Sequence, residues 1–95
     1  NEDSILHFVD SAIFFANKAN EIAIKLERVD MQAIALRGVS ISYQISGNYT
    51  KALEFELKIL SLYEKVNDSI GIAYTKDNLG AIYDDLNEIN LSINP

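Results

Sequence analysis

Cysteine and tryptophan are absent from this sequence of 95 residues, and histidine and proline occur once each. Without cysteine the chain has neither a disulfide framework nor thiol chemistry, and we expect a cytoplasmic location. The single histidine, His7, has no neighbours at the spacing of a metal or catalytic site, so we expect a surface or turn role for it. The sequence also lacks a phosphate-binding loop and a nucleophile–base pair. We therefore predict no enzyme activity, no metal site and no cofactor.

Basic residues are scarce, with 8 lysine and arginine residues against 14 aspartate and glutamate residues and a net charge of -6. Nucleic acids and anionic membranes attract basic surfaces, so we expect neither as a partner, and a neutral or basic protein partner is favoured. No apolar run approaches the roughly 18 residues of a membrane span. The acidic start at residues 1–3 also differs from the basic start of a signal peptide.

Apolar residues recur at three- and four-residue steps along the chain, which predicts helices and no strands. The predicted helices cover residues 4–28, 31–46, 50–66 and 69–86, and a fifth begins near Ile89 and ends at Pro95. Gly47 predicts a left-handed helix end, and Asn48 or Thr50 is the expected N-cap of the helix that follows. Asn87 and Glu88 stand forty positions later and predict the last turn. The first segment could break near His7, but without glycine or proline there we expect one continuous helix.

The residue pattern repeats after forty positions. Residues of the same type stand at Ala12 and Ala52, Lys25 and Lys65, Ala33 and Ala73, Val39 and Leu79, and Tyr43 and Tyr83. Repetition at a fixed period is typical of proteins in which each helix pair stacks on the next and buries a face that it cannot bury alone. A closed four-helix bundle is the alternative. We expect residues 1–95 to form a single domain and to be a fragment of a longer protein, since both end patterns are incomplete.

Two short motifs lie in register within this pattern. Residues 78–83 read Asn-Leu-Gly-Ala-Ile-Tyr, and Gly47, Tyr49, Ala52 and Leu53 stand at the preceding turn. They resemble the tetratricopeptide repeat family, which carries N-L-G-x-x-Y in its first helix and G-x-Y-x-x-A-[LI] at its turn. The family's usual period is about 34 residues, so the chain resembles the long-period variants of bacterial signalling and regulatory proteins. The resemblance implies an all-α solenoid of antiparallel helix pairs in a right-handed superhelical stack, with about two repeats and part of a third.

By this resemblance, the first helix of each pair lines a concave groove that holds a peptide or a partner helix. The predicted groove residues are Ile34, Arg37, Ile41, Gln44, Tyr74, Asp77, Ala81, Asp84 and Asp85. For the acidic residues we favour a solvated helix face over a patch for a basic peptide or a cation. Some family members bind a terminal carboxylate with lysine and asparagine. This chain offers only Arg37 and Asn78, so we do not expect that activity.

The sequence therefore predicts a protein–protein interaction module with a possible role in signalling, and its partner is a protein or a peptide. The alternative is a structural module that forms a homodimer. A stack of fewer than three repeats leaves apolar faces uncovered at its ends, and a symmetric dimer would bury them.

Overall fold

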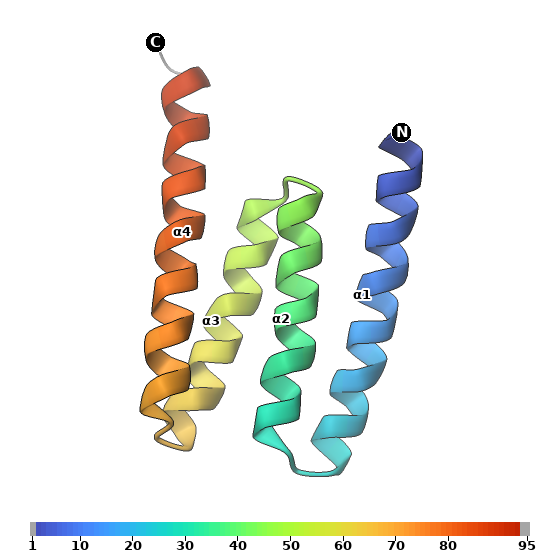
Figure 1. The fold of residues 1–95 in the computed structure, drawn as a ribbon, viewed down its shortest axis with the longest axis vertical. Coiled ribbons are helices and arrows are strands. Elements are labelled where there is room, and N and C mark those ends of the chain that lie inside the picture. The colour runs from blue at the N-terminus through green and yellow to red at the C-terminus, as the bar shows by residue number, and fades with distance from the viewer. Residues whose placement is uncertain (1, 94–95) are drawn as a thin grey trace.

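The computed structural model describes residues 2–93, which fold into four α-helices and contain no strand (Figure 1). The helices are α1 (Glu2–Lys25), α2 (Val29–Ile45), α3 (Tyr49–Lys65) and α4 (Ser69–Ile93). Three residues connect each helix to the next, which makes successive helices antiparallel neighbours. The predicted all-α class is confirmed, and α1 passes through His7 without a break. None of the helices within residues 2–93 has the length and apolar character that a membrane span requires.

The three connections share one hydrogen-bond pattern because each contains a residue in the left-handed backbone region. Glu27, Gly47 and Asn67 lie twenty positions apart and have φ angles of 55°, 82° and 54°. In each turn, the amide of the following residue donates to the carbonyl five positions earlier, at 2.8–3.0 Å. This bond closes the end of the preceding helix. Asn48 and Asp68 then cap α3 and α4 by accepting a hydrogen bond from the amide three positions later.

The predicted fifth helix is wrong, because α4 continues through Asn87 and Glu88 as far as Ile93. Within residues 2–93, only the three turn residues described above have a left-handed backbone. Neither Asn87 nor Glu88 is a glycine or a proline, and glutamate is a good helix former, so the local sequence continues the helix. The part of the prediction that concerns Asn94 and Pro95 lies outside the described residues.

Close backbone contacts join each helix only to its neighbours in sequence. In the described part of the chain, α2 lies between α1 and α3, α4 contacts α3, and α1 does not contact α4 (Figure 1). The helices therefore form an open row and not the closed bundle considered as an alternative. The Cα atoms extend over 47 × 30 × 14 Å, so this row is thin in one direction. The core between α2 and α3 contains Ala33, Leu36 and Ile59, with Phe55, Leu62 and Tyr63 packed against them.

Burial on α2 recurs on α4 after forty positions. Buried residues on α2 are Ala35, Val39 and Ser42, and their counterparts Thr75, Leu79 and Ile82 are buried on α4. On the opposite face, burial differs between α2 and α4. Ala33 and Ser40 of α2 are buried under α3, whereas their counterparts Ala73 and Gly80 are exposed, since no helix follows α4 in the described structure.

Gly71 allows a close approach between α3 and α4. A Cβ atom at Gly71 would lie 2.5 Å from Cδ1 of Tyr63, so the tyrosine ring occupies the space that a side chain would need. Forty positions earlier the two residues are Met31 and Ala23, in which the large and the small member change places.

Candidate functional site

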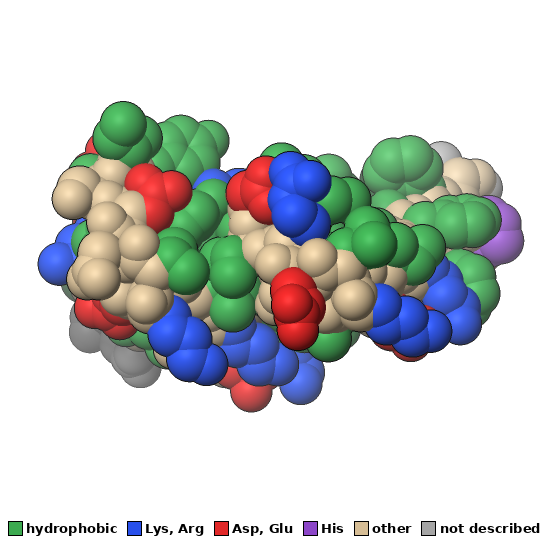
Figure 2. All heavy atoms as spheres, turned by 90° about the horizontal axis from the view of Figure 1, so that it is seen from below, with side chains coloured by type: hydrophobic (Ala, Val, Ile, Leu, Met, Phe, Trp, Pro, Cys, Tyr) green, Lys and Arg blue, Asp and Glu red, His purple; other side chains and the backbone are tan. Residues whose placement is uncertain are grey.

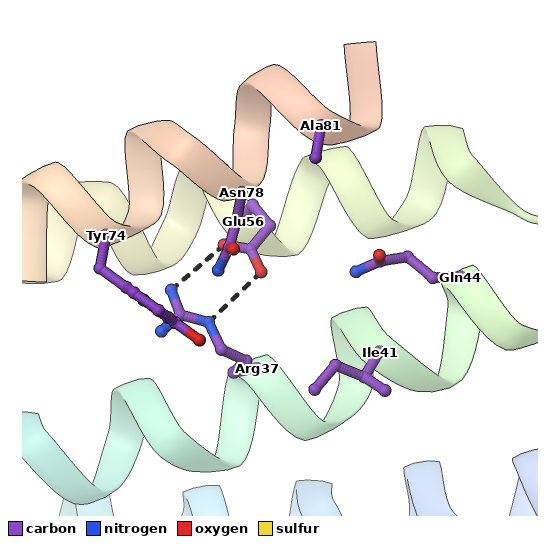
Figure 3. Close-up of a pocket in the computed structure, with 7 residues that line it drawn as sticks. All are labelled: Arg37, Ile41, Gln44, Glu56, Tyr74, Asn78 and Ala81. Atoms are coloured by element: carbon purple, nitrogen blue, oxygen red, sulfur yellow. Dashed lines mark hydrogen bonds and ion pairs between the residues drawn. The ribbon is translucent and has the colours of Figure 1, made fainter. Parts of the chain in front are cut away.

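A charged pair lies where α2, α3 and α4 meet. Arg37 of α2 donates from Nε and Nη2 to the two carboxylate oxygens of Glu56 on α3, at 3.4 and 3.2 Å (Figure 3). Nη2 also donates to the Thr75 hydroxyl on α4 at 2.9 Å. The Glu56 side chain is 1% exposed and that of Arg37 is 15% exposed. The pair is therefore almost removed from solvent, and it links three helices.

Helical spacing brings these polar groups onto buried faces. Glu56 follows Ala52 by four residues and precedes Ile59 by three, and both of these neighbours are fully buried on α3. Thr75 lies on the face of α4 that packs on α3, and its hydroxyl also donates to the carbonyl of Gly71 at 2.7 Å. A buried carboxylate needs such a set of partners, because leaving it unpaired costs several kcal/mol.

The ring of Tyr74 lies over the guanidinium group of Arg37. Cζ of the arginine is 4.7 Å from the ring centroid, which is within the roughly 6 Å of a cation–π contact. In Figure 3 the tyrosine extends from α4 toward the arginine on α2. The Tyr74 residue is 56% exposed, so the ring is fixed on one side and still open to another molecule.

A hollow of about 130 Å³ lies beside this stack. Its lining consists of Arg37, Ile41, Gln44, Glu56, Tyr74, Asn78 and Ala81 (Figure 3). Pockets for small molecules usually measure about 300–1,000 Å³, so this hollow suits a single side chain. Gln44 and Asn78 bring carboxamides, each of which can donate and accept hydrogen bonds. The Gln44 amide nitrogen donates to the hydroxyl of Ser40 at 3.2 Å.

The predicted groove residues fall into three groups. Those that line the hollow are Arg37, Ile41, Gln44, Tyr74 and Ala81. Ile34 lines a second hollow at the contact between α1 and α2, together with Ala19, Met31 and Ala35. Asp77, Asp84 and Asp85 line neither of these two hollows. Asp77 and Asp84 are exposed, and Asp85 is partly buried.

The sequence analysis did not assign Glu56 or Thr75 to the site. A signal for Glu56 was present, because it interrupts the apolar stripe of the third predicted helix. A charge on a buried stripe requires a partner of opposite sign. Thr75 gave a weaker signal, since threonine is compatible with a buried or an exposed position and its role depends on the arginine from another helix.

The ion pair between Arg28 and Asp30 contrasts with the buried one. Arg28 Nη2 lies 2.8 Å from a carboxylate oxygen of Asp30, and both side chains are more than half exposed. The hydrogen bond from Arg28 is the main cause that holds the pKa of Asp30 below its ordinary value. Arg28 is the N-cap residue of α2, Asp30 lies in its first turn, and neither residue lines the hollow.

The lining of the hollow offers apolar contact, aromatic stacking and hydrogen bonds. Among the residues that the structure describes, no three histidine, cysteine, aspartate or glutamate side chains are grouped so as to hold a metal ion. Comparisons of this chain with protein-family models, with curated proteins and with solved structures found no match.

Proposed function

We propose that this chain is a protein-interaction module that holds an extended peptide in the hollow between α2 and α4. We also propose that its helices stack as right-handed superhelical pairs of the tetratricopeptide type, within a signalling or regulatory protein. Two observations support the stacking. The left-handed turn residues recur every twenty positions, and the buried face of α2 recurs on α4. An open row of helices offers a continuous surface to another chain.

An exposed aromatic ring held beside a hollow the size of a side chain is the observation that carries the proposal. Tyrosine and arginine are enriched among the residues that dominate binding energy at protein interfaces. Tyr74 already stacks on Arg37, and two hydrogen bonds to Glu56 hold the arginine. The ring therefore loses little conformational freedom when a ligand binds, and that saving favours affinity.

The chemistry of the hollow defines the peptide that it accepts. An apolar side chain of the peptide packs against Ile41, Tyr74 and Ala81, and the carboxamides of Gln44 and Asn78 bind its backbone. Glu56 already compensates the charge of Arg37, so the hollow does not select a carboxylate. The net charge of -6 favours lysine or arginine in the flanking parts of the peptide.

The test uses a phage-displayed library of linear peptides selected on the immobilised chain. The strongest binder is synthesised with a fluorescent label, and fluorescence anisotropy gives its Kd for the wild type and for Tyr74→Ala. Loss of a stacked aromatic anchor should weaken binding by about 2 kcal/mol, which is about thirtyfold in Kd.

Tyr83→Ala is the matched control. Tyr83 also lies on α4 and is 53% exposed, against 56% for Tyr74, but it does not line the hollow. We expect its Kd to stay within about twofold of the wild type, since surface substitutions away from a site change free energies by about 0.5 kcal/mol or less. The proposal is wrong if no peptide is selected, or if Tyr74→Ala binds the selected peptide as tightly as the wild type does.

A further inference from the structure

The contact between α2 and α3 is a template for a contact that the chain does not make internally. Tyr43 of α2 stacks on Phe55 of α3, with ring centroids 5.8 Å apart. The Ser40 hydroxyl donates to the carbonyl of Ala52 at 3.4 Å, which brings the two antiparallel backbones close together. An aromatic pair and a pair of small residues thus lie in this interface, beside its core of Ala33, Leu36 and Ile59.

α4 carries part of the α2 side of this interface without a helix on it, with the exposed Lys76 in the place of the core residue Leu36. The counterparts of Ala33, Ser40 and Tyr43, forty positions later, are Ala73, Gly80 and Tyr83. All three of these α4 residues are exposed. A Cβ atom at Gly80 would meet nothing within 4 Å. Another helix can therefore approach α4 here as closely as α3 approaches α2.

α1 carries the α3 side of the same interface. The counterparts of Ala52, Phe55 and Leu62, forty positions earlier, are Ala12, Phe15 and Ile22. Phe15 is 68% exposed and Ile22 is also exposed, whereas Phe55 and Leu62 pack against the core between α2 and α3. Figure 2 shows hydrophobic side chains beside the single histidine at the α1 end of the molecule. Phe15 and Ile22 are therefore large apolar side chains that no helix covers in the described structure.

The two terminal helices also match in length. α1 has 24 residues and α4 has 25, whereas α2 and α3 have 17 each. The extra residues lie at the start of α1 and at the end of α4. In Figure 1 both helices extend upward beyond the turn between α2 and α3. Phe8 and Leu91 lie in these extensions and are exposed.

We propose that a second copy of this chain docks its α1 on the α4 of the first copy, in the arrangement that α3 has on α2. In this register Phe15 of one copy stacks on Tyr83 of the other, as the equivalent aromatic pair does within the chain. The same register brings Ile5 opposite Leu91 in the extensions. The two copies use different surfaces, so each pair keeps one free α1 and one free α4 and adds further copies in a line. This assembly differs from the symmetric dimer that the sequence suggested.

The inference is independent of the proposed peptide site, which uses other residues of α4. Its test uses one variant on each surface. Gly80→Arg places a long charged side chain on α4 where the backbone has open space, and Phe15→Glu places a charge on α1 at a largely exposed position. Both variants should keep the helical circular dichroism of the wild type. Tyr83→Arg and Ile22→Glu form a second pair with the same expectation, in case one variant fails to fold.

Sedimentation velocity at rising concentration measures the assembly. The mass of the wild type should rise above the 10.6 kDa of one chain, and each variant alone should stay at that mass. An equimolar mixture of Gly80→Arg and Phe15→Glu should form a species of twice the monomer mass and no larger. In that species the first variant contributes an intact α1 and the second an intact α4.

Ile24→Glu is the matched control. Ile24 also lies on α1 and is 54% exposed, and its counterpart Glu64 is exposed on α3. This variant should associate as the wild type does. The proposal is overturned if the wild type stays monomeric at its highest soluble concentration, or if the mixed variants do not associate. It is also overturned if Phe15→Glu abolishes association and Gly80→Arg has no effect, because that result identifies pairing between two α1 helices.

Discussion

Removing Arg37 should destabilise the fold more than removing Glu56, although the two form one ion pair. Arg37→Met leaves a carboxylate that is 1% exposed without its cation, and breaking a buried pair in this way costs about 3–5 kcal/mol. Glu56→Met leaves a guanidinium group that is 15% exposed and keeps its contacts with Thr75 and Tyr74. For this variant we expect a loss of about 1–3 kcal/mol.

The double variant Arg37→Met/Glu56→Met should lie within about 1 kcal/mol of the wild type, because apolar residues of similar volume often replace a buried ion pair at little cost. Urea unfolding followed by far-UV circular dichroism suits this all-helical chain, and linear extrapolation gives the free energy of unfolding. A variant that is unfolded in buffer can be measured in trimethylamine oxide, which strengthens burial in all four proteins alike.

The exposed pair of Arg28 and Asp30 is the control. Its closest oxygen and nitrogen atoms are 2.8 Å apart, against 3.2 Å for the buried pair. Arg28→Met should nevertheless change the free energy of unfolding far less than Arg37→Met does, because exposed pairs contribute little. The reasoning is refuted if Glu56→Met costs more than Arg37→Met, or if the two single losses add up in the double variant.

Two further predictions concern glycine and pH. Gly71→Ala should destabilise the chain, since overpacking against Tyr63 costs about 1–3 kcal/mol and exceeds the gain of about 1 kcal/mol in helix propensity. Gly80→Ala should stabilise the chain by up to about 1 kcal/mol, because the new Cβ atom enters open space. Thermal unfolding measures both variants, and melting temperatures that shift in the same direction would contradict the difference in packing at the two glycines. The hydrogen bond from Arg28 lowers the pKa of Asp30 in the folded state, so the stabilisation is present above the unfolded pKa and is lost as the pH falls through the folded pKa. An NMR titration of the Asp30 carboxyl carbon should give a lower midpoint than in Arg28→Ala, and equal midpoints would disprove the cause.

Local residue chemistry accounts for the parts of the fold that the sequence predicted. Gly47 adopts the left-handed conformation at low cost, and Asn48 after it caps the next helix, so this turn is encoded by two adjacent residues. The expected turn at Asn87 rested on its alignment with Gly47 and not on its own chemistry. A helix ends only where the backbone leaves the helical region, and nothing at Asn87 or Glu88 requires this.

The site was harder to predict than the helices because its central contact joins distant positions. Arg37 and Tyr74 were assigned to the groove from a family resemblance, and both line the hollow. The sequence did not indicate that Arg37 would turn toward Glu56, nineteen positions away on the next helix. That choice of rotamer depends on the distance between α2 and α3 and on the burial of the carboxylate. Both quantities exist only after the helices have packed.

The arginine that joins α2 to α4 also affects the shape of the whole row. Backbone contacts in the described chain connect only successive helices, whereas Arg37 reaches over α3 to Thr75, 38 positions away. This hydrogen bond holds α2 and α4 at a fixed distance across α3. The width of the hollow between α2 and α4 therefore depends on it. A substitution at Arg37 should therefore alter the spacing of two helices that share no backbone contact, and not only the local ion pair.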